Sequence, residues 1–328
     1  MGGIAVKRLS VALFACALLL LAACGGPGTS TPTPAPMPPV ETPSPTPTPT
    51  LAPMPTPTGF RFTRENFPRL DGSTSLVPLG EAIASVLLGE SREDVQDLVQ
   101  FSRTSQSFRM LAYDNVDILV TADPSESVLE EIRGLDLELD MKPIATEALV
   151  FVVNAENPVD GLTAEQVRGI YTGRITNWAE VGGEDRAILP FQRNADAGSQ
   201  TIMLSAVMGD IPMMEPPTAY VIGGMEGLIE AVRSFDGAEG SIGYSVYYYA
   251  HDMEMAKDLK ILAIDGVQPT AETIRAEDYP FRAPYYVTIR ANTPADSPTR
   301  VLFDWILSAE GHRLIESQGY VPAAEGQA

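Results

Sequence analysis

The sequence predicts an α/β fold, divided into two lobes, for the region between residues 60 and 322. Short apolar runs of strand length alternate there with segments whose apolar residues recur at helical spacing, which is the pattern of α/β proteins. The region holds about 265 residues, which is large for a single hydrophobic core. We therefore expect two α/β lobes.

Four apolar runs predict buried strands. They lie at residues 117–121, 148–153, 260–264 and 285–289. The run at 148–153 is the strongest, because it is apolar throughout.

Three segments predict helices. Residues 76–88 carry apolar side chains at helical spacing. Thr163 and Gln166 have the spacing of a capping box, which opens a helix that runs through Tyr171. A long helix over 298–317, with Gly319 as its stop, is indicated by five apolar residues on one side: Val301, Leu302, Trp305, Ile306 and Leu314.

The charge balance argues against nucleic acid as a partner. The chain has 22 Lys and Arg residues against 43 Asp and Glu residues, a net charge of −21. Binding to a phosphate backbone needs a basic footprint, which this balance does not offer. The acidic residues form no long block, so they indicate a solvated surface.

The first 23 residues are predicted to be a signal peptide. Lys7 and Arg8 precede an apolar stretch at 9–21, which is too short for a comfortable transmembrane span. The residues up to Cys24 resemble the bacterial lipobox, in which that cysteine takes the lipid. The alternative is an ordinary signal peptide followed by a chance cysteine. We expect Cys24 to be lipidated and the protein to be extracytoplasmic, anchored to the bacterial cell membrane.

Residues 24–58 are predicted to be a lipidated cysteine followed by an extended tether. From 25 to 58, 22 of 34 residues are Pro or Thr, so this segment cannot bury apolar surface. At about 3 Å per residue, it would reach roughly 100 Å when stretched. Cys16 would leave with the signal peptide, so the mature chain has no cysteine for a disulfide, a zinc site or a thiol nucleophile.

Three loops rich in Ser and Thr stand between predicted strands and helices. They lie at residues 71–75, 102–107 and 192–201, and a fourth polar segment, 121–124, ends a predicted strand. Hydroxyls and free N–H groups at helix starts bind anions without net positive charge, and such sites gather at the carboxyl ends of strands. Each loop alone is an ordinary helix cap, but three together, with Arg193 in one, favour an anion site.

These loops resemble those of the phosphate-binding periplasmic (PstS-like) solute-binding proteins, which deliver phosphate to ABC importers. Gly-Ser-Thr-Ser at 72–75 with Pro78, and the segments at 116–124, 162–178 and 241–244, match that family in order and spacing. Arg193 followed by Asp-Ala-Gly-Ser-Gln-Thr at 196–201 resembles its Arg…Asp-Gly-Ser-Gly-Thr loop. The resemblance covers nearly all of residues 68–322.

The resemblance implies a type II periplasmic-binding-protein-like fold. Lobe 1 would combine residues 59–148 with 247–328, lobe 2 would hold 149–246, and a two-strand hinge would join them. It also implies binding without an enzymatic reaction or a cofactor, with inorganic phosphate as the ligand and an ABC permease as the partner. We expect a monomer.

The same resemblance implies which residues bind the ligand. Thr74 and Ser75 would donate from the first loop, and Thr104 from the second, with Ser105 as the alternative if the alignment slips by one. The other implied ligand-binding residues are Asp123, Arg193, Ser199, Gln200 and Thr201. Asp196 would orient Arg193. The sequence departs from the family at Gln200, Arg103 and Gln106, where glycine is common, and in two extra residues before Asp196.

Asp123 would select a protonated anion. A carboxylate repels a bound anion unless the ligand donates a proton to it, which HPO4²⁻ and H2PO4⁻ can do and sulfate at neutral pH cannot. The alternative is that Asp123 is a turn residue before Pro124.

Several other interpretations stay open at this point. The ligand could be another oxyanion, such as molybdate, tungstate or sulfate, or the protein could sense phosphate at the surface without transport. A surface phosphohydrolase would need a metal cluster or a nucleophile paired with a base, and His251 and His312 are isolated, so no metal site is expected. The tyrosines at 247–249 would form an aromatic cage or, more in keeping with their neighbours, a hinge or sheet segment.

Overall fold

The computed structural model describes residues 59–234 and 238–323. The predicted signal peptide, the lipidated Cys24 and the Pro/Thr-rich tether lie outside the described residues. Within the described residues, no helix is both long and apolar enough to cross a membrane.

Strands and helices alternate along the chain, as expected of an α/β fold. The strands are β1 (Leu70–Gly72), β2 (Ile118–Thr121), β3 (Leu139–Asn154), β4 (Gly161–Leu162), β5 (Leu189–Pro190), β6 (Gln192–Arg193), β7 (Val221–Ile222), β8 (Ser241–Val246), β9 (Leu259–Ile261), β10 (Ala263–Ile264), β11 (Arg282–Arg290) and β12 (Val321–Pro322). The helices are α1 (Val77–Leu88), α2 (Thr104–Ala112), α3 (Glu126–Gly134), α4 (Ala164–Tyr171), α5 (Gly198–Ile202), α6 (Met225–Ser234), α7 (Ala271–Arg275), α8 (Pro298–Ile306) and α9 (Ala309–Ser317).

One mixed sheet organises these elements, and β3 is its longest strand. Its strand order is β1-β2-β11-β3-β8-β5, with β9 and β12 also paired to β3. The first part of β3 pairs antiparallel with β11, and the second part pairs with β8 and β9. Because β3 changes partners along its length, it belongs to two groups of elements.

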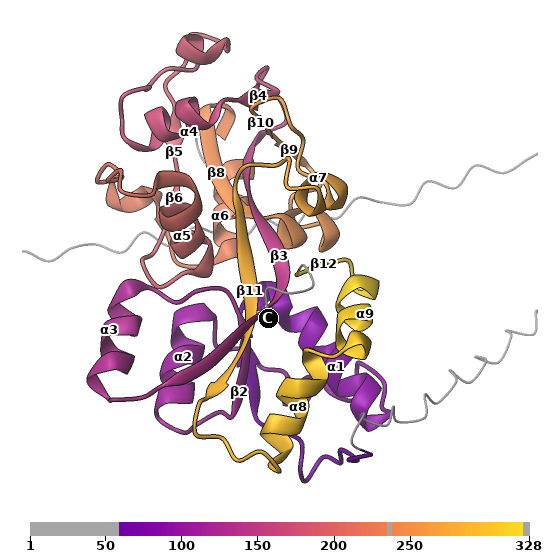
Figure 1. The fold of residues 1–328 in the computed structure, drawn as a ribbon. Coiled ribbons are helices and arrows are strands. Elements are labelled where there is room, and N and C mark those ends of the chain that lie inside the picture. The colour runs from indigo at the N-terminus through magenta and orange to yellow at the C-terminus, as the bar shows by residue number, and fades with distance from the viewer. Residues whose placement is uncertain (1–58, 235–237, 324–328) are drawn as a thin grey trace, which may run out of the picture. The chain divides into compact units, whose positions relative to one another are not determined.

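Figure 1 shows these two groups, which β3 and β11 join. We call the group with β1, β2, α1, α2, α3, α8 and α9 the α2 half, and the group with β5, β6, β8, α4, α5 and α6 the α5 half. The lobe boundaries between residues 148 and 149 and between 246 and 247 stay a prediction.

Buried apolar side chains stabilise both halves. The main core cluster includes the whole apolar run at 148–153 of β3, each residue of which is fully buried. A second, smaller cluster packs α2 and α3 against β2, through Phe108, Leu119 and Val128 among others. Burial of this kind is the main source of stability in a chain without a cysteine in its described part.

The local sequence signals are confirmed in most places. The capping box is present, because the Thr163 hydroxyl accepts from the Gln166 N–H and the Gln166 side chain accepts from the Thr163 N–H. The predicted strands at 117–121 and 285–289 correspond to β2 and β11. The run at 260–264 instead forms two short strands, because the chain leaves β3 after Ile261 and pairs with β4 from Ala263.

The single helix predicted over 298–317 is wrong, because the structure has two helices there. Ser308 caps the second helix, α9, by accepting from the Gly311 N–H at 3.3 Å. A Cβ at Gly311 would meet the Ile306 carbonyl oxygen at 2.2 Å, so glycine permits the close turn between α8 and α9. Apolar residues at helical spacing continue across this turn, so the sequence pattern predicts a single helix.

The tyrosines at 247–249 form neither a cage nor a strand, and a hinge at this segment stays a prediction. Tyr247 leads into a π-helical turn at Tyr248–Asp252 that follows β8, and all three side chains are buried. Tyr248 stacks on Tyr320, with ring centroids 3.8 Å apart.

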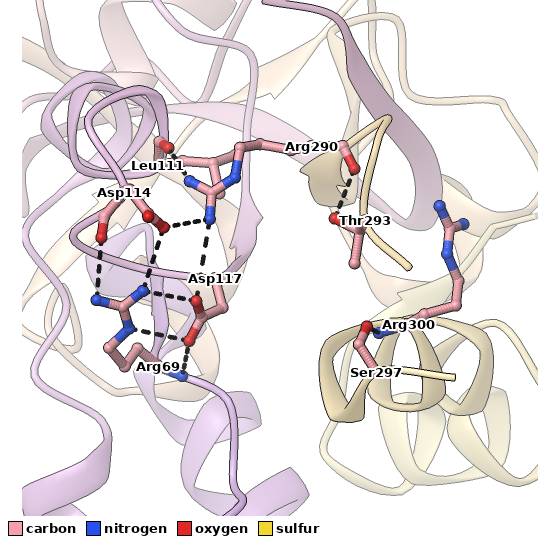
Figure 2. Close-up of polar contacts among 8 residues, drawn as sticks. All are labelled: Arg69, Leu111, Asp114, Asp117, Arg290, Thr293, Ser297 and Arg300. Carbon is pink, nitrogen blue, oxygen red and sulfur yellow. Dashed lines mark hydrogen bonds and ion pairs between the residues drawn. The ribbon is translucent and has the colours of Figure 1, made fainter. Parts of the chain in front are cut away.

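Ion pairs tie together β1, β2, α2 and β11 at their ends (Figure 2). Asp117 accepts from the Arg69 backbone N–H at 2.8 Å and from its guanidinium at 2.7 and 3.0 Å. Arg290 donates to the Leu111 carbonyl and to the Asp114 carboxylate, both at 2.6 Å. We call these four charged residues, Arg69, Asp114, Asp117 and Arg290, the basal network.

Candidate functional site

A cavity of about 480 Å³ lies between the α2 half and the α5 half. Its walls come from the β1–α1 loop, the start of α2, the β6–α5 loop, the start of α6, β8 and β11. Among the predicted site residues, it is lined by Thr74, Ser75, Thr104, Arg193, Asp196 and Ser199. The three Ser/Thr-rich loops therefore do meet in space, as the sequence predicted, and we call this cavity the cleft.

Arg193 is the buried cation of the cleft. Its guanidinium donates to Ser199 Oγ at 3.2 Å and to the carbonyl oxygens of Ile222 and Gly223 at 3.1 and 3.3 Å. Its Nη1 also lies 3.2 Å from the Met225 sulfur. Burial lowers the pKa of Arg193 to about 10, so it remains protonated at neutral pH. Within the described residues no ion pair involves Arg193, so its positive charge lacks a matching anion there.

A cluster of hydroxyl groups faces this cation from the α2 half. Ser73 Oγ lies 2.8 Å from both Thr104 Oγ1 and Thr121 Oγ1 and accepts from the Ala122 N–H at 3.2 Å. Ser75 Oγ lies 2.7 Å from the Tyr285 hydroxyl. These bonds hold the first loop against α2 and β11, which positions its hydroxyls at the cleft.

Ser73 lines the cleft and Asp71 bonds two of the loops that form it, and the sequence predicted neither as a ligand residue. The buried Asp71 carboxylate accepts from the Gly72 N–H at 2.7 Å and the Ser102 N–H at 2.6 Å, so it joins the first and second loops. Burial raises the pKa of Asp71, against the hydrogen bonds from Ser102 and Gly72. Both residues lie in the first Ser/Thr-rich loop, so the loop itself was the available signal.

Asp196 contacts a different arginine from the one expected. It accepts from Arg109 Nη1 at 3.0 Å and from Ser125 Oγ at 2.8 Å, both in the α2 half. Partial burial would raise the pKa of Asp196, but these two hydrogen bonds outweigh it and lower the pKa. Asp196 therefore links the two halves beside the cleft, and Arg193 is oriented by backbone carbonyls instead.

Four predicted ligand residues are not among those that line the cleft, namely Ser105, Asp123, Gln200 and Thr201. Thr201 Oγ1 donates to the Asp123 carbonyl at 2.9 Å, which is a third hydrogen bond between the halves. The Asp123 carboxyl group interacts with the Tyr286 hydroxyl, and burial raises the pKa of Asp123. Gln200 Oε1 accepts from the Tyr244 hydroxyl and the Arg193 N–H.

Ser105, the alternative to Thr104, does not line the cleft. Its hydroxyl accepts from the Ser125 N–H at 3.1 Å. The structure therefore favours Thr104, which lines the cleft and is 4% exposed.

Further lining residues were not predicted as ligand residues from the sequence. Tyr285 directly precedes the irregularity in the β3–β11 pairing, where the register shifts between Tyr285 and Tyr286, and such bulges redirect side chains. Arg103, Met225, Glu226, Val246 and Tyr249 also line the cleft. Between residues 59 and 323, as far as the structure describes them, no group of three His, Cys, Asp or Glu side chains could hold a metal ion.

The fold and the cleft together define a class of protein. A sheet shared by two α/β halves, with a cleft of arginine and hydroxyl groups between them, is the architecture of a solute-binding protein. The family model for the PBP superfamily domain matches residues 69–310. This chain belongs to that superfamily.

Similar proteins include phosphate-binding proteins from several bacteria. The phosphate-binding protein PstS of Bacillus subtilis (strain 168) is 24% identical over 259 residues, which cover 78% of this chain and 80% of that protein. PstS of Staphylococcus aureus (strain USA300) is 22% identical over 264 residues, which cover 78% of each chain.

Solved structures share the fold. A putative phosphate ABC transporter substrate-binding protein from Clostridium perfringens, with bound phosphate, aligns with a TM-score of 0.59 at 22% identity, over 78% of this chain and 98% of that chain. An ABC-type phosphate transport receptor from Vibrio cholerae aligns with a TM-score of 0.56 at 24% identity, over 77% and 98%.

Proposed function

We propose that this protein is an extracytoplasmic, lipid-anchored solute-binding protein that captures phosphate, as HPO4²⁻ or H2PO4⁻, and delivers it to an ABC importer. The observation that carries the proposal is Arg193, a buried cation whose described partners are neutral and which lies among hydroxyl groups of two loops. A buried charge without a counterion is costly, so the site is complementary to an anion. The function is binding, without a reaction.

Hydrogen-bond donors would add to the affinity that the charge of Arg193 gives the anion site. Thr74, Ser75 and Thr104 would donate from one side, and Arg193 and Ser199 from the other, so that closing the two halves surrounds the ligand. The similar PstS proteins and the phosphate-bound neighbour support phosphate as the anion. An ABC permease would recognise the closed form.

Cys24 would hold the protein at the membrane. Residues 25–58 would serve as a tether of up to roughly 100 Å, which leaves the folded region free to meet a permease in the same membrane. The proposal includes two lobes, one formed by residues 59–148 with 247–328 and the other by 149–246, and a monomeric protein.

Isothermal titration calorimetry of the purified protein tests the anion site. Arg193→Ala should weaken phosphate binding by about a hundredfold or more, because the matching charge is removed from a buried site. Arg186→Ala is the matched control, since Arg186 is an exposed arginine paired with Glu184 and Glu239. Unchanged phosphate affinity in Arg193→Ala would contradict the proposal.

Competition between phosphate and sulfate tests the choice of anion. Asp123 lies next to Ala122, which lines the cleft, and we propose that it accepts the proton of the ligand. Wild type should therefore reject sulfate, and Asp123→Asn should relax that rejection. Equal competition by sulfate in the wild type would favour the alternative, a binder of molybdate, tungstate or sulfate.

A further inference from the structure

Most hydrogen-bond donors of Arg193 are already used by the protein. An arginine carries five N–H groups. In Arg193, the contacts made are from Nε to the Ile222 carbonyl, from Nη1 to Ser199 Oγ and the Met225 sulfur, and from Nη2 to the Gly223 carbonyl. These four contacts leave one N–H group for a ligand. Arg193 therefore brings positive charge to the cleft, but it cannot also offer the pair of parallel N–H groups with which arginine holds a phosphate.

Arg103 is a second arginine of the cleft, and its donors are unused. It directly precedes α2, is exposed to solvent and lines the cleft together with Arg193 and Ser199. Within the part of the chain that the structure describes, no hydrogen bond or ion pair involves the Arg103 side chain. All five of its N–H groups are therefore available to a ligand in the cleft.

The guanidinium groups of Arg103 and Arg193 are near enough for their charges to interact. Burial is the main cause that lowers the pKa of Arg193, and the positive charge of Arg103 lowers it further. Two cations that line the same cleft repel each other. An anion bound between them would be attracted by both, so binding would replace this repulsion with two favourable interactions.

The backbone of Arg103 has a conformation that glycine normally adopts. Its φ is 79° and its ψ is 160°, a region that residues with a Cβ rarely occupy. An arginine here therefore strains the backbone, and a glycine would not. Strained residues of this kind gather at ligand sites. The fold thus carries a strained residue at the point where its side chain lines the cleft.

We propose that Arg103 is a further ligand-binding residue, whose guanidinium contacts the bound phosphate from the α2 half while Arg193 contacts it from the α5 half. Arg103 would supply the paired N–H groups, and Arg193 the buried charge. Because Arg103 is exposed, it also offers a positive charge to an anion that approaches a chain with a net charge of −21. The inference rests on the proposed function and adds a residue to its site.

Calorimetry with inorganic phosphate on the purified protein tests this contact. Arg103→Ala should weaken phosphate binding by about tenfold or more, because it removes charged hydrogen bonds. Arg61→Ala is the matched control and should bind like wild type, since Arg61 is exposed, forms no ion pair with a described residue and lies outside the cleft lining. If Arg103→Ala binds within about twofold of wild type, the inference is overturned and the proposed function stands. If wild type does not bind phosphate, both are overturned.

Arg103→Gly separates a ligand contact from a structural role. Glycine adopts this φ and ψ without strain, so Arg103→Gly should unfold at a higher urea concentration than Arg103→Ala and yet bind phosphate as weakly. Salt should also weaken phosphate binding more steeply in wild type than in either variant, because an exposed charge is screened. Binding by Arg103→Gly that is as tight as that of wild type, or a salt dependence equal to that of wild type, would overturn the contact.

A carboxylate in the cleft lining is the other possible partner of Arg103. Glu226 lies in the first turn of α6, lines the cleft and forms no ion pair between residues 59 and 323 as far as they are described. If Arg103 acted as a latch that pairs with Glu226 on closure, Glu226→Gln would weaken phosphate binding. We expect Glu226→Gln to strengthen it instead, because a carboxylate repels the anion. Weaker phosphate binding by Glu226→Gln would overturn the ligand contact in favour of the latch.

Discussion

At the scale of single residues, Glu147 is the most unusual ionisable group. It is 3% exposed and accepts from the backbone N–H groups of Ala148 at 2.8 Å and Tyr248 at 3.4 Å. It also interacts with the hydroxyl of Tyr285, which bonds Ser75 of the first loop. Glu147 thus sits where β3 passes between the halves, one side chain away from the cleft.

Glu147 should make stability depend on pH near neutrality. Burial raises the pKa of Glu147 to about 7, against the hydrogen bonds it accepts, and the carboxyl group of Asp252 adds to the rise. A carboxyl with a raised pKa stabilises the fold fully below its unfolded pKa of about 4.5, and this contribution is lost as the pH rises to about 7.

Glu147→Gln keeps the acceptor oxygen and cannot ionise. At pH 8 it should be more stable than wild type by at most about 3 kcal/mol, and at pH 4.5 the two proteins should have nearly equal stability. Urea denaturation at both pH values measures this difference. A difference that is the same at both values would show that Glu147 does not titrate in this range.

At the scale of elements, the basal network should stabilise the α2 half (Figure 2). Burial would raise the pKa of Asp117, but the hydrogen bonds from Arg69 and the nearby charge of Arg290 outweigh it and lower the pKa. A carboxylate with a lowered pKa stabilises the fold above its unfolded pKa of about 4, and this contribution is lost as the pH falls. Asp117→Asn should therefore cost about 1–3 kcal/mol at pH 7, and the difference from wild type should shrink below pH 4.

The control for the basal network is an exposed ion pair. Asp160 pairs with Lys260 at 2.8 Å, and its side chain is 87% exposed. Asp160→Asn should cost less than about 1 kcal/mol. Equal unfolding free energies for the Asp117 and Asp160 variants at pH 7 would mean that the network is no more than a surface pair.

Sequence signals predict elements well where the deciding contacts are local. The capping box at Thr163 spans one helical turn, so its residues alone determine the helix start. The cap at Ser308 is equally local, but the apolar stripe on both sides of it favours one continuous helix. Because Glu147 is charged, the sequence predicts that the strand begins after it. In the structure Glu147 lies within β3, and its carboxyl group accepts a hydrogen bond from the Ala148 N–H.

At the scale of the whole molecule, the sequence predicts which loops form the site but not how they pair across it. The Ser/Thr-rich loops and Arg193 could be recognised because each carries its chemistry within a few residues. The bond from Arg109 to Asp196 joins residues 87 positions apart and depends on how the halves approach.

Closure of the whole molecule should depend on the contact between Gly198 and Thr104. Gly198 has no positive φ, so Gly198→Ala adds no backbone strain and acts only through its Cβ, which would lie 2.4 Å from Thr104 Oγ1. The variant should separate α5 from α2, weaken phosphate binding by about tenfold and cost about 1–3 kcal/mol of stability. Small-angle X-ray scattering should show less compaction on adding phosphate than wild type shows.

A double-mutant cycle separates this steric effect from the role of Thr104 as a donor. Thr104→Ala removes the hydroxyl that the new methyl group meets, so Gly198→Ala should cost less phosphate affinity in that background than in wild type. Additive losses would show that α5 and α2 do not meet when the ligand is bound. In that case the halves would close on the ligand by another route. The cycle therefore tests the hinge motion that the proposed function requires.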